Sequence, residues 1–162
     1  MNLSRRAFTH AVTATFAAQP FLAMANSTAP IKLGICANLD RAEKLKAAGF
    51  DCIECGVSGL LKPDVDDAKF ATDLAKIITS ALPIQSCNGF IPAKFKLTGP
   101  TVDHDAALAY AEIACQRADK ANIPFIVLGS GKARQVPEGF AAAEAKKQFI
   151  SFCQALGKRI AN

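Results

Sequence analysis

Four short apolar segments, each followed by a segment with helical periodicity, constrain the fold of this chain more than any other feature. The apolar segments are expected to be strands, at 31–36, 50–57, 83–88 and 124–128. The segments that follow them are expected to be helices, near 40–48, 66–81, 103–122 and 141–160. Strands that alternate with helices predict a parallel sheet with helices packed outside it.

The number of these units sets the architecture. A βα barrel has eight strand–helix units in about 250 residues, whereas this sequence has 162 residues and four units. We therefore expect an α/β fold of parallel (β/α) units, the first four of a TIM barrel, or half barrel. Four parallel strands would leave two open edges, which favour a partner, most simply a second copy in a homodimer. An open doubly wound sheet is the weaker alternative, because the loop at 37–39 lacks a glycine-rich cradle for a ligand.

The N-terminal 25 residues have the pattern of an export signal. Ser4–Phe8 contains paired arginines, a short apolar stretch follows, and Ala23–Ala25 is a small-x-small cleavage motif. Paired arginines indicate the twin-arginine route, so we expect a periplasmic or secreted protein cleaved after Ala25. The stretch is shorter than the roughly 20 residues of a spanning helix, so no membrane association is expected after cleavage. Residues 26–30 are expected to be a linker, and residues 31–162 the folded domain.

Charge and cysteine content argue against nucleic-acid binding and a disulfide framework. Without Arg5 and Arg6, the chain has 17 basic and 14 acidic residues and no basic run, so nucleic-acid binding is not indicated. The six cysteines lie in expected strands or helices, which favours buried apolar thiols over disulfides. A Cys36–Cys87 or Cys36–Cys55 pair at the strand ends is the alternative.

Three motifs at the ends of the expected strands resemble one family. They are Gly49–Glu54 on the second strand, Asn88–Pro92 after the third and Gly129–Phe140 after the fourth. In order and spacing they are similar to the sugar phosphate isomerase/epimerase superfamily, the xylose-isomerase-like barrels. The resemblance implies proton transfer next to a sugar carbonyl, with Mn²⁺ or Mg²⁺ held by residues from strands five to eight. Those strands have no counterpart in the sequence, so we expect no metal ligand in this chain and no turnover by it alone.

Five residues at strand ends are candidates for a sugar or polyol site. Glu54 is a carboxylate within an apolar strand, where it must be paired or serve chemistry. Asn88 could bind hydroxyls beside Phe90, whose ring could stack on a sugar face. Ser130 lies between two glycines whose N–H groups could bind an anion, and Arg134 could bind a carboxylate or phosphate. Each has a structural alternative: an internal hydrogen bond or ion pair for Glu54, turn chemistry for Asn88 and Phe90, and a loop with positive φ angles plus a surface arginine for Ser130 and Arg134.

Two functions fit these observations. The first is an exported sugar isomerase/epimerase-like barrel, in which this part of the chain orients the substrate. The alternative is a non-catalytic half-barrel module that dimerises and binds small polyols. His104, the only histidine after the leader, is expected at the start of a helix in a solvated or capping role, so a histidine-rich zinc cluster is not indicated.

Overall fold

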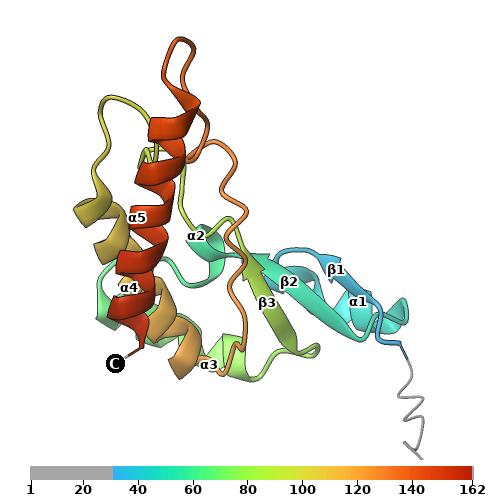
Figure 1. Ribbon diagram of the computed structural model, residues 1–162. Helices are drawn as coiled ribbons and strands as arrows, with labels where there is room; N and C mark the ends of the chain where they lie inside the picture. The colour runs from blue at the N-terminus through green and yellow to red at the C-terminus, as the bar shows by residue number, and fades with distance from the viewer. Residues whose placement is uncertain (1–30, 162) are drawn as a thin grey trace, which may run out of the picture. The chain divides into compact units, whose positions relative to one another are not determined.

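The computed structural model describes residues 31–161, so the expected leader and linker lie outside the described residues. The chain divides into two units, Met1–Pro30 and Ile31–Asn162, and the second contains every described residue. Its elements (Figure 1) are β1 (Gly34–Cys36), the 3-10 helix η1 (Leu39–Arg41), α1 (Ala42–Ala47), β2 (Cys52–Gly56), α2 (Val57–Leu60), α3 (Asp67–Ile78), β3 (Ile84–Asn88), α4 (His104–Lys120) and α5 (Ala142–Ile160).

The three strands form one parallel sheet in the order β1–β2–β3. Helix α1 lies between the first two strands in sequence, and α3 lies between the second and third. Parallel strands need such crossover connections, because a tight turn can join only antiparallel neighbours. The expected α/β fold of parallel strands alternating with helices is therefore confirmed, although β1 is shorter than expected and α2 was expected to be loop.

The expected fourth strand at 124–128 is reduced to a single parallel bridge between Cys87 and Ile126. The N–H of Cys87 donates to the carbonyl of Phe125 at 2.9 Å, and the N–H of Val127 donates to the carbonyl of Cys87 at 2.7 Å. Pro124 has no N–H to donate, and within residues 31–161 no strand pairs with the outer edge of this segment. The expectation of a full strand is therefore wrong, but the segment keeps the register of one.

Helix ends follow the capping residues in the sequence. The side chains of Asp66 and Asp103 each accept a hydrogen bond from the N–H three residues further on, at 2.7 and 3.0 Å. Both satisfy a donor that the first turn of a helix leaves free. After α1, Gly49 takes φ +90°, and the N–H of Phe50 donates to the carbonyl of Leu45, which is a Schellman motif. Within the described range, no helix combines the length and apolarity needed to cross a bilayer.

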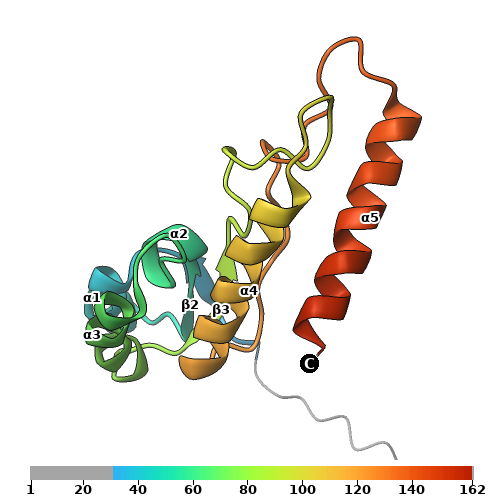
Figure 2. The ribbon, with the colours of Figure 1, turned by 90° about the vertical axis from the view of Figure 1, so that its left-hand side faces the viewer.

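One face of the sheet packs against the helices. The core contains Ile53 and Cys55 from β2 and Ile84 and Cys87 from β3, together with Phe70 of α3, the alanine-rich face of α4 and Phe152 of α5. Helix α5 runs alongside α4 (Figure 2). Because all the buried strand residues face the helices, the opposite face of the sheet is left for other contacts.

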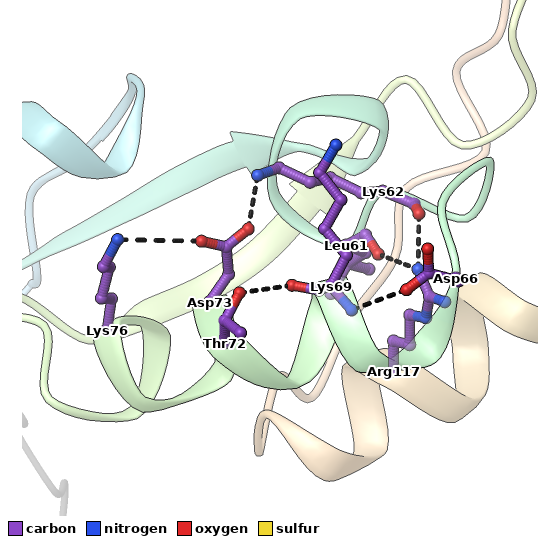
Figure 3. A network of polar contacts seen from close by, with 8 residues as sticks. All are labelled: Leu61, Lys62, Asp66, Lys69, Thr72, Asp73, Lys76 and Arg117. Carbon is purple, nitrogen blue, oxygen red and sulfur yellow. Dashed lines mark hydrogen bonds and ion pairs between the residues drawn. The ribbon is translucent and has the colours of Figure 1, made fainter.

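A buried arginine joins α4 to the segment between α2 and α3 (Figure 3). Arg117 is 2% exposed, and its guanidinium donates to the carbonyls of Leu61 and Lys62. It also donates to the carbonyl of Val65 and to the carboxylate of Asp67. The ring of Phe70 lies 4.7 Å from the guanidinium carbon, in the range of a cation–π contact. These bonds fix the chain directly after α2, close to the carboxyl end of β2.

Candidate functional site

A row of polar side chains crosses all three strands on the face opposite the core. In the sheet register, Glu54 of β2 is paired with Cys36 of β1 and with Ser86 of β3. Paired residues on neighbouring strands lie on the same face of a sheet. The residues on either side of Glu54 in β2, Ile53 and Cys55, are buried in the core. Because successive side chains of a strand alternate between faces, Glu54 and its paired residues lie on the open face. We call Cys36, Glu54, Ser86 and Asn88 the polar row.

A bulge in β3 brings two members of the polar row onto this face. Ile53 pairs with Ile84, but Glu54 pairs with Ser86, so Gln85 is an extra residue in β3. Strict alternation would put Ile84 on the same face as Ser86 and Asn88. The extra residue shifts the alternation. As a result Ile84 is buried, while Ser86 and Asn88 both reach Glu54.

Both oxygens of the Glu54 carboxylate accept hydrogen bonds within the polar row. Ser86 Oγ donates to Oε2 at 2.5 Å, and Asn88 Nδ2 donates to Oε1 at 2.8 Å. The thiol of Cys36 also donates to Oε1, at 3.3 Å. Glu54 is therefore held in one orientation, and because a carboxylate has about four acceptor sites, these three bonds leave about one site, on Oε2, for a ligand.

The same bonds set the charge of the site. The hydrogen bond from Ser86, followed by that from Asn88, lowers the pKa of the Glu54 carboxyl, because both stabilise the ionised form. The hydrogen bond to Glu54 raises the pKa of the Cys36 thiol. At neutral pH the polar row therefore carries one negative charge, on Glu54, beside a protonated thiol.

A shallow hollow of about 240 Å³ lies along this part of the sheet. It is lined by residues of all three strands: Gly34, Ile35, Cys36, Cys52, Ile53, Glu54, Gln85 and Ser86. A carboxylate acceptor within a hollow of this kind suits a ligand that carries several hydroxyl groups.

The structure places four of the five predicted site residues in two pairs. Glu54 and Asn88 are in direct contact, whereas Ser130 and Arg134 form hydrogen bonds within the loops. Ser130, at φ +35°, accepts a hydrogen bond from the N–H of Ile91 at 2.8 Å, and Arg134 Nε donates to the carbonyl of Gly129 at 2.7 Å.

Phe90 is separated from the other candidates by its burial. It is 4% exposed and belongs to the hydrophobic core. Gly89, at φ +63°, turns the chain directly after β3, and the next side chain then packs inward. In this structure the ring of Phe90 therefore packs against the core, and its stacking on a sugar stays a prediction.

Sequence reasoning did not select Ser86 and Cys36 as site residues. Ser86 lies two residues before Asn88, so the alternation of a strand places both on one face. This spacing was the available signal for Ser86. The pairing of Cys36 with Glu54 depends on the register between β1 and β2, which a single sequence does not encode visibly.

The six cysteines are free thiols. Cys55 and Cys87 are buried, as expected for apolar thiols. Cys36 is exposed, and its thiol donates a hydrogen bond to the carboxylate of Glu54. The alternative pairs of Cys36 with Cys55 or Cys87 are not formed. Cys36 lies on the open face and both of those partners lie on the core face, so the sheet itself separates them.

Two exposed apolar side chains extend the open face beyond β3. Ile126 pairs with Cys87, which faces the core. Phe125 and Val127 must then point to the opposite face, on the side of the polar row. Their side chains are 62% and 47% exposed. The open face therefore combines a charged polar row with an uncovered apolar edge.

The described residues do not fit a metal centre of the kind that the family resemblance implies. Between residues 31 and 161, no group of three or more His, Cys, Asp or Glu side chains is placed to hold a metal ion. Glu54 and Cys36 supply one carboxylate and one protonated thiol, and Asn88 a neutral amide. We therefore assign no chemical step in this chain to a metal.

Comparison with solved structures places these residues in a known architecture. The chain superposes with a TM-score of 0.59 on the crystal structure of 3-keto-D-glucoside 4-epimerase, YcjR, from E. coli, apo form. The α/β fold of parallel strands alternating with helices therefore matches part of that structure. The match covers 82% of this chain and 52% of that chain at 15% sequence identity, so the chain spans about half the length of the structure it matches. No protein-family model and no curated protein matches the sequence.

Proposed function

We propose that this chain supplies the substrate-orienting part of a sugar isomerase/epimerase-like barrel, with the polar row as its polyol-binding group. The observation that carries the proposal is the Glu54 carboxylate, which Ser86 and Asn88 hold on the open face of the sheet. In βα barrels, active-site residues lie at the carboxyl ends of the strands. The structural likeness to a sugar epimerase supports the choice of substrate class.

Glu54 is suited to binding hydroxyl groups. Its pKa is lowered, so it is ionised at neutral pH and accepts charge-assisted hydrogen bonds, which are stronger than neutral ones. Because two donors fix the carboxylate, a bound hydroxyl would be fixed too, and orientation of this kind lowers the barrier of a later step.

The same lowered pKa makes Glu54 a poor general base. Proton removal next to a carbonyl is most efficient when the pKa of the base lies near the working pH. We therefore propose that Glu54 orients the substrate and is not the base. We further propose that the barrel reaction is proton transfer next to a sugar carbonyl, and that none of the described residues is its base. On this proposal the chain alone incorporates no deuterium from ²H₂O into a ketose.

Calorimetric titration of neutral hexoses and polyols tests the proposal. The full chain should bind a subset of them, and Glu54→Gln should weaken that binding by about tenfold or more, since hydrogen bonds to charged groups contribute about 1.5–3 kcal/mol. Glu43→Gln removes an exposed carboxylate on α1, outside the polar row. This matched control should leave the affinity unchanged. Equal affinity in the wild type and Glu54→Gln would refute the proposal.

We also propose that the protein is exported by the twin-arginine route and acts in the periplasm or outside the cell. The support is the sequence alone: paired arginines in Ser4–Phe8 and the cleavage motif Ala23–Ala25. A leader of this kind would be removed before the protein meets its substrate.

As a second candidate function, we propose a half-barrel module that dimerises and binds polyols without chemistry. The exposure of Phe125 and Val127 on the open face favours it, because a second copy could cover them. Light scattering of the full chain should then give twice the monomer mass, and Phe125→Ser should shift the equilibrium toward the monomer. A monomeric wild type at all concentrations would exclude this candidate.

A further inference from the structure

A second hollow, of about 400 Å³, lies where the two long loops meet the first turns of α5. It is lined by Thr98, Gly131, Arg134, Val136, Ala142, Ala145, Lys146 and Phe149, and shares no lining residue with the hollow beside Glu54. The only charged side chains among them are Arg134 and Lys146, and both are cations. We call this site the cationic hollow.

The walls of the cationic hollow are held in place by hydrogen bonds between segments far apart in the sequence. Gln148 of α5 accepts from the N–H of Gly99 at 2.8 Å and donates to its carbonyl at 2.9 Å. Thr98 Oγ1 donates to the carbonyl of Gln135 at 3.0 Å. Because the loops are already fixed to each other and to α5, a ligand would not have to order them, and such preorganisation favours binding.

The charges of Arg134 and Lys146 are available to a ligand. Arg134 uses Nε to bind the carbonyl of Gly129, which fixes the plane of the guanidinium. Within residues 31–161, no acidic side chain pairs with Arg134 or Lys146. Lys147, the next residue, lies 3.6 Å from the carboxylate of Glu144. Two unneutralised cations at one hollow attract an anion, and a guanidinium can bind a carboxylate or phosphate with two parallel hydrogen bonds.

The remaining lining residues favour an organic anion over an inorganic one. Phe149 is half-buried, Val136 is 43% exposed, and Ala145 is buried, so the hollow offers apolar contact next to its two charges. We propose that the cationic hollow binds a small organic anion: a phosphate ester or a carboxylate on a short carbon skeleton. This site is separate from the polar row and does not depend on the proposed polyol binding.

Calorimetric titration of the full chain with glycerol 3-phosphate and with gluconate tests this inference. Inorganic phosphate and neutral glycerol are the comparison ligands. At least one organic anion should bind saturably, more tightly than inorganic phosphate, and with an affinity that falls as salt is added. Glycerol should give no heat attributable to this site. The phosphate and carboxylate arms distinguish the two anionic groups.

Three variants make the test specific to the site. Arg134→Gln and Lys146→Gln should each weaken binding of the anion by about tenfold, since hydrogen bonds to charged groups contribute about 1.5–3 kcal/mol. Lys147→Gln should leave it unchanged, and circular dichroism should show all three variants folded. Absence of saturable binding, or an equal loss in Lys147→Gln, or no loss in Arg134→Gln and Lys146→Gln, would overturn the inference.

Discussion

Asn88 lies opposite Gly56 in the sheet register, yet its side-chain amide donates to Glu54 Oε1, two residues earlier on β2, at 2.8 Å. A Cβ at Gly56 would lie 3.9 Å from Asn88 Oδ1, an ordinary van der Waals contact, so the diagonal contact does not depend on the glycine. Together with Ser86, which is directly opposite Glu54, Asn88 determines both the orientation and the ionisation of the carboxylate.

Removal of the strongest of these donors should change the titration of Glu54. Ser86→Ala should raise the pKa of the Glu54 carboxyl, because the Ser86 hydrogen bond is the largest cause of its lowering. Carbon-13 NMR of the labelled carboxyl measures this directly. Ser151→Ala, an exposed serine on α5, is the control and should leave the titration unchanged. An unchanged pKa in Ser86→Ala would contradict the geometry of the polar row.

The lowered pKa of Glu54 also predicts a pH dependence of stability. A carboxyl whose folded-state pKa is lower than its unfolded-state pKa stabilises the fold above the unfolded value, and this contribution is lost as the pH falls through the folded value. The difference in free energy of unfolding between wild type and Glu54→Gln should therefore shrink as the solution is acidified. Urea titrations at a series of pH values measure it, and a difference that grows toward low pH would have the wrong sign.

Thiol reactivity should separate the cysteines by face. Cys36 is exposed, whereas burial raises the pKa of Cys55 to about 11 and that of Cys87 to about 12. A disulfide reagent should therefore modify Cys36 in the native protein and reach the two core thiols only after unfolding. Glu54→Gln should speed the reaction of Cys36, because the hydrogen bond to the charged carboxylate raises the pKa of this thiol. Loss of the rapid phase in Cys36→Ser would confirm the assignment.

Arg117 should be the most sensitive charged residue of the fold. Arg117→Lys keeps the charge but cannot reach the carbonyls of Leu61, Lys62 and Val65 together, so buried acceptors lose their donors. We expect a loss of about 2–4 kcal/mol in the free energy of unfolding. Arg159→Lys, which alters an exposed pair with Glu112, should cost no more than about 0.5 kcal/mol. Similar losses in both variants would show that Arg117 has no special role.

Two glycines with open surroundings should respond oppositely to alanine. Neither Gly49 nor Gly157 has an atom within 4 Å of an added Cβ. The two substitutions therefore differ only in the backbone conformation that alanine must adopt. Gly49→Ala should destabilise the protein by about 1 kcal/mol, because Gly49 has φ +90°. Gly157→Ala, within α5, should stabilise it by about 0.5–1 kcal/mol. Thermal unfolding of the two variants beside the wild type measures the sign of each change in stability.

Much of the helical structure could be predicted from local signals. Asp66 and Asp103 predicted the starts of α3 and α4, and Gly49 predicted the end of α1, because caps depend on only a few neighbouring residues. The parallel arrangement of the strands also followed from the alternation of apolar segments and helices. The burial of Phe90 could not be predicted, since the positive φ of Gly89 and the packing of the core decide the direction of its side chain.

The geometry of the polar row could be predicted only in part. Glu54 and Asn88 stood out as polar residues at strand ends, but their contact depends on the bulge at Gln85, which shifts β3 by one residue. The incomplete pairing of 124–128 was also invisible, because its apolar residues have strand propensity whether or not a neighbouring strand is present. Non-local pairing decided both features.

The most direct test of the account is an amide-resolved NMR titration of the full chain with the tightest-binding neutral polyol. We predict that the largest shifts fall on the amides of Gly56, Ser86 and Asn88, that they saturate, and that Glu54→Gln abolishes them while leaving the spectrum folded. Saturating shifts confined to other parts of the chain, or shifts at these amides that persist in Glu54→Gln, would contradict the assignment of the polar row as a polyol-binding group.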